Sequence, residues 1–294
     1  MFVILVFKRL QLDAITMKLI LALCTLVIVQ AGVIKEDGPC DGTIINGIYH
    51  EAEVLKTDLD RPYLLAVDLS TNTLYFSYSE SKDDDVFKSA RLDLNTKQYG
   101  TIDDVTNGFA QTVDQKTHEV YIGGNDGIYK YDPASNKAEF IAERGTNIWT
   151  LYYKDVLYFS VFPSQFLYTL SNGESSRFSD LQDTKVDHFI IDNDNIMFFT
   201  NATGLYSQEK GTNNAILYEG LPENGARGIT TDVDGNVHVC YQEGIFKVNK
   251  ETSSLEKLVG LDDSFGVAFD SDNNIIYADA TRVVRLKPNK NKTC

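Results

Sequence analysis

One pattern occurs six times along this chain of 294 residues and constrains its fold more than any other feature. Each copy has a short apolar run that ends in Asp or a polar substitute, then a short polar turn, then a second apolar run centred on an aromatic residue. The copies pair residues 64–68 with 73–76, 110–114 with 119–122, 149–153 with 156–159, 189–192 with 196–199, 228–232 with 236–239, and 266–270 with 275–278. The third copy is degenerate, because its first run does not end in Asp.

The spacing of the copies identifies the repeat unit. Equivalent central positions lie 46, 37, 40, 40 and 39 residues apart, at residues 75, 121, 158, 198, 238 and 277. Each unit continues into a second hairpin, and turn dipeptides such as Asn107-Gly108 and Asp234-Gly235 separate the strand-length segments. A period near 40 built from short strands is typical of β-propeller blades. We therefore predict an all-β fold, a six-bladed β-propeller with four-stranded antiparallel blades.

The last blade lacks a fourth strand after the segment 282–286. The unassigned segment 44–55 precedes the first repeat, and we expect this N-terminal strand to complete the last blade, which removes two exposed sheet edges. This closure brings Cys40 and Cys294 together, so we predict a disulfide bridge between them. Cys240 lies within a strand, where we expect a buried free thiol.

The first 31 residues are predicted to be a signal peptide outside the fold. Met17-Lys18 begins a basic segment, residues 19–29 form an apolar core, and Ala31 ends a suitable cleavage site. We interpret residues 1–16 as a gene-model extension, with Met17 as the working start; if Met1 is used, the doubled apolar segment could anchor the chain. A single propeller domain then covers residues 32–294, and we expect a secreted, extracellular protein.

Composition excludes one class of partner and fits secretion. There are 27 Lys and Arg against 42 Asp and Glu, a formal net charge of -15, with no basic cluster. Such a surface repels nucleic acid, and no other run is apolar enough to span a membrane after signal removal. Surface acidity favours a monomer. The sequons at Asn201 and Asn291 fit the secretory pathway and are predicted glycosylation sites.

The first strand of each propeller blade lines a central channel, so the residues that lead into these strands form one mouth of that channel. These segments combine aromatic rings with Asn, Arg and His, a mixture that suits an aromatic small molecule. The alternative is that the rings simply fill the channel and the Asn residues form turns. The candidate ligand-binding residues are Arg61, Tyr63, Asn107, Phe109, Asn147, Trp149, His188, Arg227 and Phe265.

No sequence motif indicates catalysis. The chain has no Gly-x-Ser-x-Gly elbow, no P-loop, no Gly-x-Gly-x-x-Gly after a strand and no His-Glu-x-x-His. The acidic clusters at 83–85 and 103–104 lack EF-hand spacing, and we expect them in solvated loops. We therefore expect a protein that is not an enzyme, with no catalytic residues, no metal site and no cofactor.

One enzyme family shares features of the mouth segments. Asn107-Gly108-Phe109 and Asn224-Gly225 resemble the segments from which calcium-dependent lactonase propellers, of the gluconolactonase and regucalcin type, supply metal ligands. The resemblance implies a calcium-dependent lactonase or esterase as an alternative function. This chain has Asn224 where that family's pattern has a metal-binding Asp, and loss of a carboxylate weakens a site for a hard cation.

Taken as a whole, the sequence resembles the insect ommochrome-binding proteins. The likeness covers the mature chain, from residues 33–42 through 200–206 to Cys294, and depends on no short motif. It implies a haemolymph carrier that binds a tryptophan-derived pigment non-covalently, for transport and without turnover. The resemblance assigns no pigment-contact residues in this sequence.

The implied ligand suits the predicted mouth. A xanthommatin-like ommochrome is a planar tricycle with carboxylate groups, so it requires flat apolar side chains and cations. The four aromatic residues of the candidate set supply the rings, and Arg61 and Arg227 supply guanidinium groups for the carboxylates. A second alternative is an extracellular propeller that binds a protein partner through a loop of one face.

Overall fold

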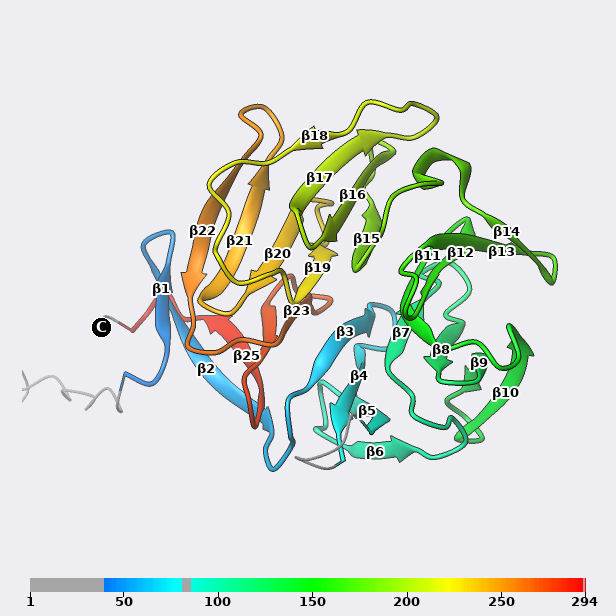
Figure 1. The fold of residues 1–294 in the computed structure, drawn as a ribbon. Coiled ribbons are helices and arrows are strands. Elements are labelled where there is room, and N and C mark those ends of the chain that lie inside the picture. The colour runs from blue at the N-terminus through cyan, green and yellow to red at the C-terminus, as the bar shows by residue number, and fades with distance from the viewer. Residues whose placement is uncertain (1–39, 81–85, 293) are drawn as a thin grey trace, which may run out of the picture. The chain divides into compact units, whose positions relative to one another are not determined.

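Six antiparallel sheets surround a central axis in the structure, a computed structural model that describes residues 40–80, 86–292 and 294 (Figure 1). The innermost strands of the six sheets, β3, β7, β11, β15, β19 and β23, contact one another in a closed ring. The fold is a six-bladed β-propeller, as the repeat predicts. The predicted signal peptide and the acidic cluster 83–85 lie outside the described residues.

Blades 1 to 3 each have four strands that follow one another from the channel outward. The short runs of the repeat form the two inner strands, because their alternating apolar residues pack on the neighbouring blades. The bounds are β3 (Tyr63–Asp68), β4 (Thr73–Ser79), β5 (Phe87–Asp93) and β6 (Tyr99–Ile102); β7 (Ala110–Val113), β8 (Val120–Gly124), β9 (Gly127–Asp132) and β10 (Lys137–Ala142); β11 (Ile148–Lys154), β12 (Val156–Val161), β13 (Leu167–Ser171) and β14 (Glu174–Arg177).

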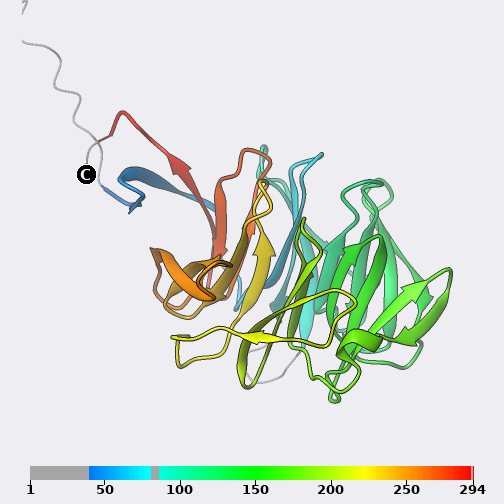
Figure 2. The ribbon, with the colours of Figure 1, turned by 90° about the horizontal axis from the view of Figure 1, so that it is seen from above.

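Blades 4 and 5 repeat this arrangement, and a short 3-10 helix, η1 (Ser179–Leu181), leads into blade 4. Blade 6 combines both ends of the domain, because β2 pairs with β25 (Figures 1 and 2). The bounds are β15 (His188–Ile191), β16 (Ile196–Asn201), β17 (Gly204–Glu209) and β18 (Ile216–Leu217); β19 (Gly228–Thr231), β20 (Val237–Tyr241), β21 (Gly244–Asn249) and β22 (Ser254–Gly260); β23 (Gly266–Phe269), β24 (Ile275–Ala278), β25 (Val283–Pro288), β2 (Ile48–Lys56) and β1 (Thr43–Ile45).

Blade 6 differs from the prediction in one respect, since it has five strands. The segment expected to form a single strand is a hairpin that turns at Asn46-Gly47, where φ is 50° and 77°. Positive φ at both central residues is the geometry of the tight hairpin turn that Asn-Gly favours. The outer strand of the hairpin, β1, therefore covers the edge that β2 would otherwise expose.

The Asp residues of the repeat close the turns between the first and second strands. Asp192 Oδ1 accepts hydrogen bonds from the backbone N–H groups of Asp194 and Ile196. Asp232 and Asp270 likewise accept from the N–H four residues on. Asp192 and Asp270 are fully buried, and a buried carboxylate requires such partners. The Asp of the repeat is therefore a structural residue in these blades.

Two links join the ends of the propeller. Arg285 on β25 donates to Glu53 on β2 through Nε and Nη2, at 3.0 and 2.7 Å, and to Asp270 through Nη1 at 3.1 Å. Cys40 and Cys294 form the predicted disulfide. The chain termini of the domain are thus held by β-pairing, an ion-pair cluster and a covalent bond.

Candidate ligand-binding channel

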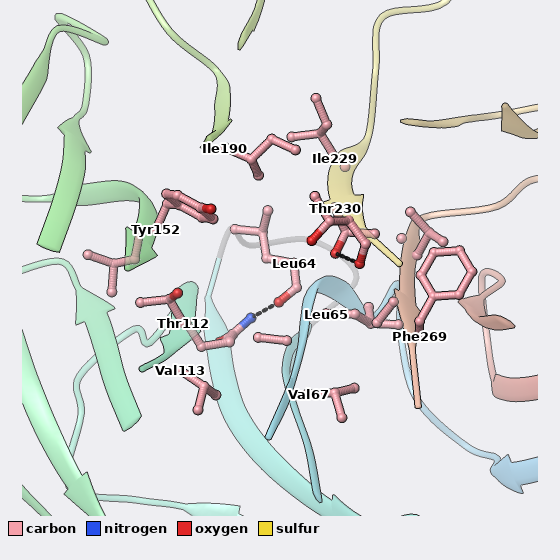
Figure 3. Close-up of a pocket in the computed structure, with 18 of the residues that line it drawn as sticks. Leu64, Leu65, Val67, Thr112, Val113, Tyr152, Ile190, Ile229, Thr230 and Phe269 are labelled. Carbon is pink, nitrogen blue, oxygen red and sulfur yellow. Dashed lines mark hydrogen bonds between the residues drawn. The ribbon is translucent and has the colours of Figure 1, made fainter. Parts of the chain in front are cut away.

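A cavity of about 210 Å³ lies in the channel and is lined by residues of all six inner strands. Its wall also includes residues that follow these strands, such as Leu69 and Val233, so it extends toward the end of the channel at which the inner strands finish. Figure 3 shows side chains from different blades, including Tyr152, Ile190 and Thr230, converging on this space. The channel therefore contains room for part of a small ligand.

Leu64 lies in the middle of the lining side chains in Figure 3. The pairing of β3 with β4 is irregular between Tyr63 and Ala66, and Leu64 has a φ of 48°. A bulge of this kind redirects a side chain, and positive φ is uncommon for Leu. The Leu64 carbonyl accepts a hydrogen bond from Gln111 Nε2 at 2.5 Å, which holds the bulge in place.

The cavity wall is apolar or uncharged over most of its area. Its described lining includes one carboxylate, Asp232, which accepts hydrogen bonds from Asn236 and His238. Burial raises the pKa of Asp232, but these hydrogen bonds outweigh burial and lower it to about 2. The hydroxyl of Tyr152 donates to the Ile191 carbonyl at 2.6 Å. The polar atoms of the wall thus have partners within the protein in most cases.

The end of the channel at which the inner strands begin is called the mouth here, and the predicted aromatic residues meet there. Tyr63 contacts Phe265 and Phe109, with ring centroids 5.5 and 5.9 Å apart. Phe109 in turn contacts Trp149, at 5.0 Å. Along this chain of contacts, from Phe265 to Trp149, the four rings come from blades 6, 1, 2 and 3. They form a continuous cluster of rings, as expected of residues at equivalent positions in adjacent blades.

Both predicted arginines also lie at the mouth. The Arg227 guanidinium carbon lies 4.2 Å from the Phe265 ring centroid, and Nη1 donates to Asp263 Oδ1 at 2.9 Å. Arg61 Nε donates to Asp60 at 3.0 Å. Burial raises the pKa of the Tyr63 hydroxyl, while the charges of Arg61 and Arg227 oppose this rise. The two guanidinium groups are therefore within electrostatic reach of one aromatic side chain.

The remaining candidates have different surroundings. His188 is the one candidate residue among the described cavity-lining residues, and its Nε2 donates to the Ala226 carbonyl at 3.2 Å. Burial lowers the pKa of His188 to about 4, so the ring is neutral at physiological pH. Asn107 has a φ of 50°, and its amide oxygen accepts from the Phe87 N–H. Asn147 accepts from the Phe162 N–H through its backbone carbonyl.

Sequence reasoning missed two rings at the mouth. Phe87 lies 4.6 Å from Phe109 and 5.8 Å from Tyr63, and Phe162 lies 5.6 Å from Trp149, measured between ring centroids. Phe87 begins the third strand of its blade, and Phe162 directly follows the second strand of another. Because neighbouring strands of a blade are antiparallel, second strands end and third strands begin at the mouth, where the first strands begin. The alternating direction of the predicted strands therefore could have identified both residues as mouth residues.

Metal-binding side chains do not gather in the described part of the chain. No group of three or more His, Cys, Asp or Glu residues there could hold a metal ion. Cys240 is a buried free thiol, as predicted, and burial raises its pKa to about 12. Within the same residues, no helix is both long and apolar enough to span a bilayer.

Solved structures with similar folds include a gluconolactonase and a calcium-binding protein. A gluconolactonase from Xanthomonas campestris aligns with a TM-score of 0.66 and 12% identity, covering 83% of this chain and 91% of its own. Regucalcin, a calcium-binding protein from Agrobacterium tumefaciens, aligns with a TM-score of 0.61 and 12% identity, covering 82% and 96%. At these identities the comparison shows the fold alone. No protein-family model matches the sequence.

The fold and the channel define a propeller of the gluconolactonase and regucalcin layout, with an aromatic, arginine-bearing mouth and a cavity whose lining residues are mostly uncharged. The sequence is 32% identical over 276 residues to the ommochrome-binding protein of Manduca sexta, covering 92% of this chain and 97% of that protein. The chain belongs to the ommochrome-binding protein family.

Proposed function

We propose that this protein is a carrier that binds a xanthommatin-like ommochrome non-covalently at the mouth of its channel and does not transform it. The observation that carries the proposal is the meeting of four rings and two guanidinium groups at one end of the channel. The flat faces suit a planar tricycle, and the cations suit its carboxylates. Contact with two rings adds about 1–3 kcal/mol beyond burial.

Arg227 has the geometry for a second acidic partner. The hydrogen bonds of Arg227 at the mouth use Nη1, toward Asp263 and the Ser264 carbonyl. A guanidinium carries five N–H donors in a rigid plane, so a ligand carboxylate can be added without displacing Asp263. The net charge of -15 makes such a cationic position selective, because an anionic ligand is repelled elsewhere on the surface.

Titration of the purified mature protein with xanthommatin, followed by visible absorbance, tests the proposal. We expect saturable binding of one pigment per chain, a shifted absorption band and recovery of the unchanged pigment after denaturation. Bovine serum albumin at equal concentration controls for non-specific adsorption of an aromatic anion. Failure to bind, or release of an altered pigment, contradicts the proposal.

A calcium-dependent lactonase is the second candidate, because the solved neighbours include a gluconolactonase. Calcium binds through six to eight oxygen ligands, several of them carboxylates. The residues that line the cavity supply the Asp232 carboxylate, which is already bound to Asn236 and His238. The donor set of the described channel therefore does not fit a calcium site, and the carrier is the preferred function.

The proposed setting is extracellular. The predicted signal peptide, the Cys40–Cys294 disulfide and the sequons agree with a secreted glycoprotein of the haemolymph. Asn291 is exposed, while the Asn201 amide nitrogen donates to the Lys185 carbonyl and would have to leave it on glycosylation. Monomeric state and transport, as opposed to storage, belong to this proposal.

A further inference from the structure

Gln111 on β7 has one buried polar atom without a partner. The residue is 5% exposed and lines the cavity. Its Nε2 donates to the carbonyls of Leu64 and Tyr63, and this fixes the orientation of the amide. Its Oε1 then has no hydrogen-bond partner within the described residues. A buried acceptor left in this state destabilises the protein, and a partner supplied by a ligand would remove that cost.

His188 adds a second acceptor to the same cavity. Because its Nε2 donates to the Ala226 carbonyl and burial keeps the ring neutral, its Nδ1 is an acceptor. No described residue donates to this atom. Two donors of the wall are already occupied, since the Tyr152 hydroxyl donates to Ile191 and the Gln111 amide to β3. The described lining includes no Lys or Arg. The cavity thus presents two acceptor atoms, Gln111 Oε1 and His188 Nδ1, that have no hydrogen-bond donor among the described residues.

We propose that Gln111 determines specificity in this channel by accepting a hydrogen bond from the ring system of the ligand, so that the reduced form of a quinone-imine pigment binds more tightly than the oxidised form. This inference rests on the proposed function. Addition of two electrons and two protons converts a ring carbonyl and a ring imine, both acceptors, into a hydroxyl and an N–H, both donors. The protein performs no redox step, because an external reductant supplies the electrons and water supplies the protons.

The position of Gln111 agrees with this role. Its amide is bonded to the carbonyls of Tyr63, an aromatic residue of the mouth, and of Leu64, at the centre of the cavity. A planar ligand that contacts the rings of the mouth and enters the channel would pass this amide. The oxidised ring would bring a carbonyl oxygen or an imine nitrogen toward acceptor atoms, and the contact would be repulsive.

The direct test measures the affinity of the wild-type mature protein for xanthommatin in both oxidation states. The oxidised pigment is titrated in air, and the dihydro form is titrated anaerobically after reduction with ascorbate. We expect at least tenfold tighter binding of the dihydro form. By linkage, a tenfold preference raises the midpoint potential of the bound pigment by about 30 mV, measured by spectroelectrochemistry. Equal affinities, or tighter binding of the oxidised form, overturn the inference.

A matched pair of variants assigns the preference to Gln111. Gln111→Met keeps the length of the side chain and removes the acceptor, so the ratio of the two affinities should fall to about one. Gln115 also links blade 2 to blade 1, but both polar atoms of its amide have partners, since Nε2 donates to Val67 and Oε1 accepts from Leu69. Gln115→Met should keep the wild-type ratio. An unchanged ratio in Gln111→Met contradicts the assignment.

The outcomes separate this inference from the proposed function. If neither oxidation state binds, the carrier function itself is wrong. If both bind with one affinity, the carrier function stands and the role of Gln111 is wrong. Should Gln111→Met fail to fold, the wild-type comparison and the midpoint potential still decide the inference.

Discussion

Arg227 is the mouth residue whose surroundings are most suited to a carboxylate ligand. It combines a ring contact with Phe265, an ion pair with Asp263 and a hydrogen bond to a backbone carbonyl. Its side chain is 25% exposed, so the guanidinium is oriented by the protein and still reachable. An oriented cation loses less conformational freedom on binding than a free surface side chain.

Replacement of this guanidinium tests its role. Arg227→Ala should weaken xanthommatin binding more than tenfold, a loss of about 1.4 kcal/mol or more, and should leave the unfolding temperature nearly unchanged. The matched control is Arg177→Ala, which removes an arginine that stacks on Phe166 at 3.5 Å on the outer strand of blade 3. The control should bind like the wild type in an absorbance titration. Unchanged affinity of Arg227→Ala would remove this residue from the site.

The sequence predicted the mouth better than the cavity. Aromatic and arginine residues immediately before or at the start of the inner strands were visible in the repeat, and the structure brings Tyr63, Phe109, Trp149 and Phe265 together. Gln111 could not be identified in this way. Its importance depends on the left-handed bulge at Leu64, which no local sequence signal encodes, because positive φ is uncommon for Leu.

Among the elements, the strand pair β2 and β25 closes the ring. Glu53 on β2 accepts hydrogen bonds from Arg285, and Lys287 and Lys97 lie within 3.0 Å of its carboxylate. Burial raises the pKa of Glu53, but the hydrogen bonds from these three cations outweigh burial and lower it to about 2. The buried guanidinium of Arg285 also binds Asp270 on blade 6.

Neutralisation of Glu53 should loosen this closure. Glu53→Gln should lower the free energy of unfolding by about 2 kcal/mol, less than for a fully buried pair because Glu53 is partly exposed. Glu51→Gln is the control on the same strand, since Glu51 is half exposed and its contact with Lys292 is 3.8 Å long. That variant should change the free energy of unfolding by less than about 0.5 kcal/mol. Urea unfolding at pH 7 measures both.

The same cluster predicts a pH dependence. A carboxylate whose folded-state pKa is depressed stabilises the protein above the unfolded-state pKa and loses this effect as the pH falls. For Glu53 the stabilisation is lost as the pH falls from about 4.5, its ordinary pKa, to about 2, its pKa in the folded protein. The stability difference between the wild type and Glu53→Gln should therefore shrink across this range. A difference that stays constant in urea unfolding at stepped pH would contradict the role of the Glu53 charge.

The repeat predicted the six blades, and the departures have local causes. In the degenerate third copy, Lys154 follows the first run, and its Nζ donates to carbonyls of blade 4. A tight turn at Asp155 replaces the Asp-capped turn of the other blades. Strand β18 has only two residues, both exposed, so no apolar alternation marked it in the sequence. The Asn46-Gly47 turn was a readable signal for the hairpin of β1 and β2.

For the whole molecule, the disulfide and the free thiol give a distinctive pattern of reactivity. Cys40 and Cys294 are bridged, while Cys240 is buried and burial raises its pKa to about 12. The thiolate is the reactive form, so Cys240 should be inert in the folded protein.

Thiol titration of the mature protein, from residue 32, checks this pattern. A chromogenic thiol reagent should detect no thiol in the native protein, one after unfolding in urea, and three after unfolding with reduction. A thiol that reacts rapidly in the native protein would contradict the burial of Cys240. Three thiols without reduction would contradict the Cys40–Cys294 bridge.

The central claim is that the channel mouth binds a planar anionic pigment. A crystal structure of the mature protein with bound xanthommatin tests it most directly. We expect electron density for the tricycle against the rings of Tyr63, Phe109, Trp149 and Phe265, with a pigment carboxylate within hydrogen-bond distance of Arg227. Pigment density on an outer face of the blades, with the mouth unchanged, would contradict the account.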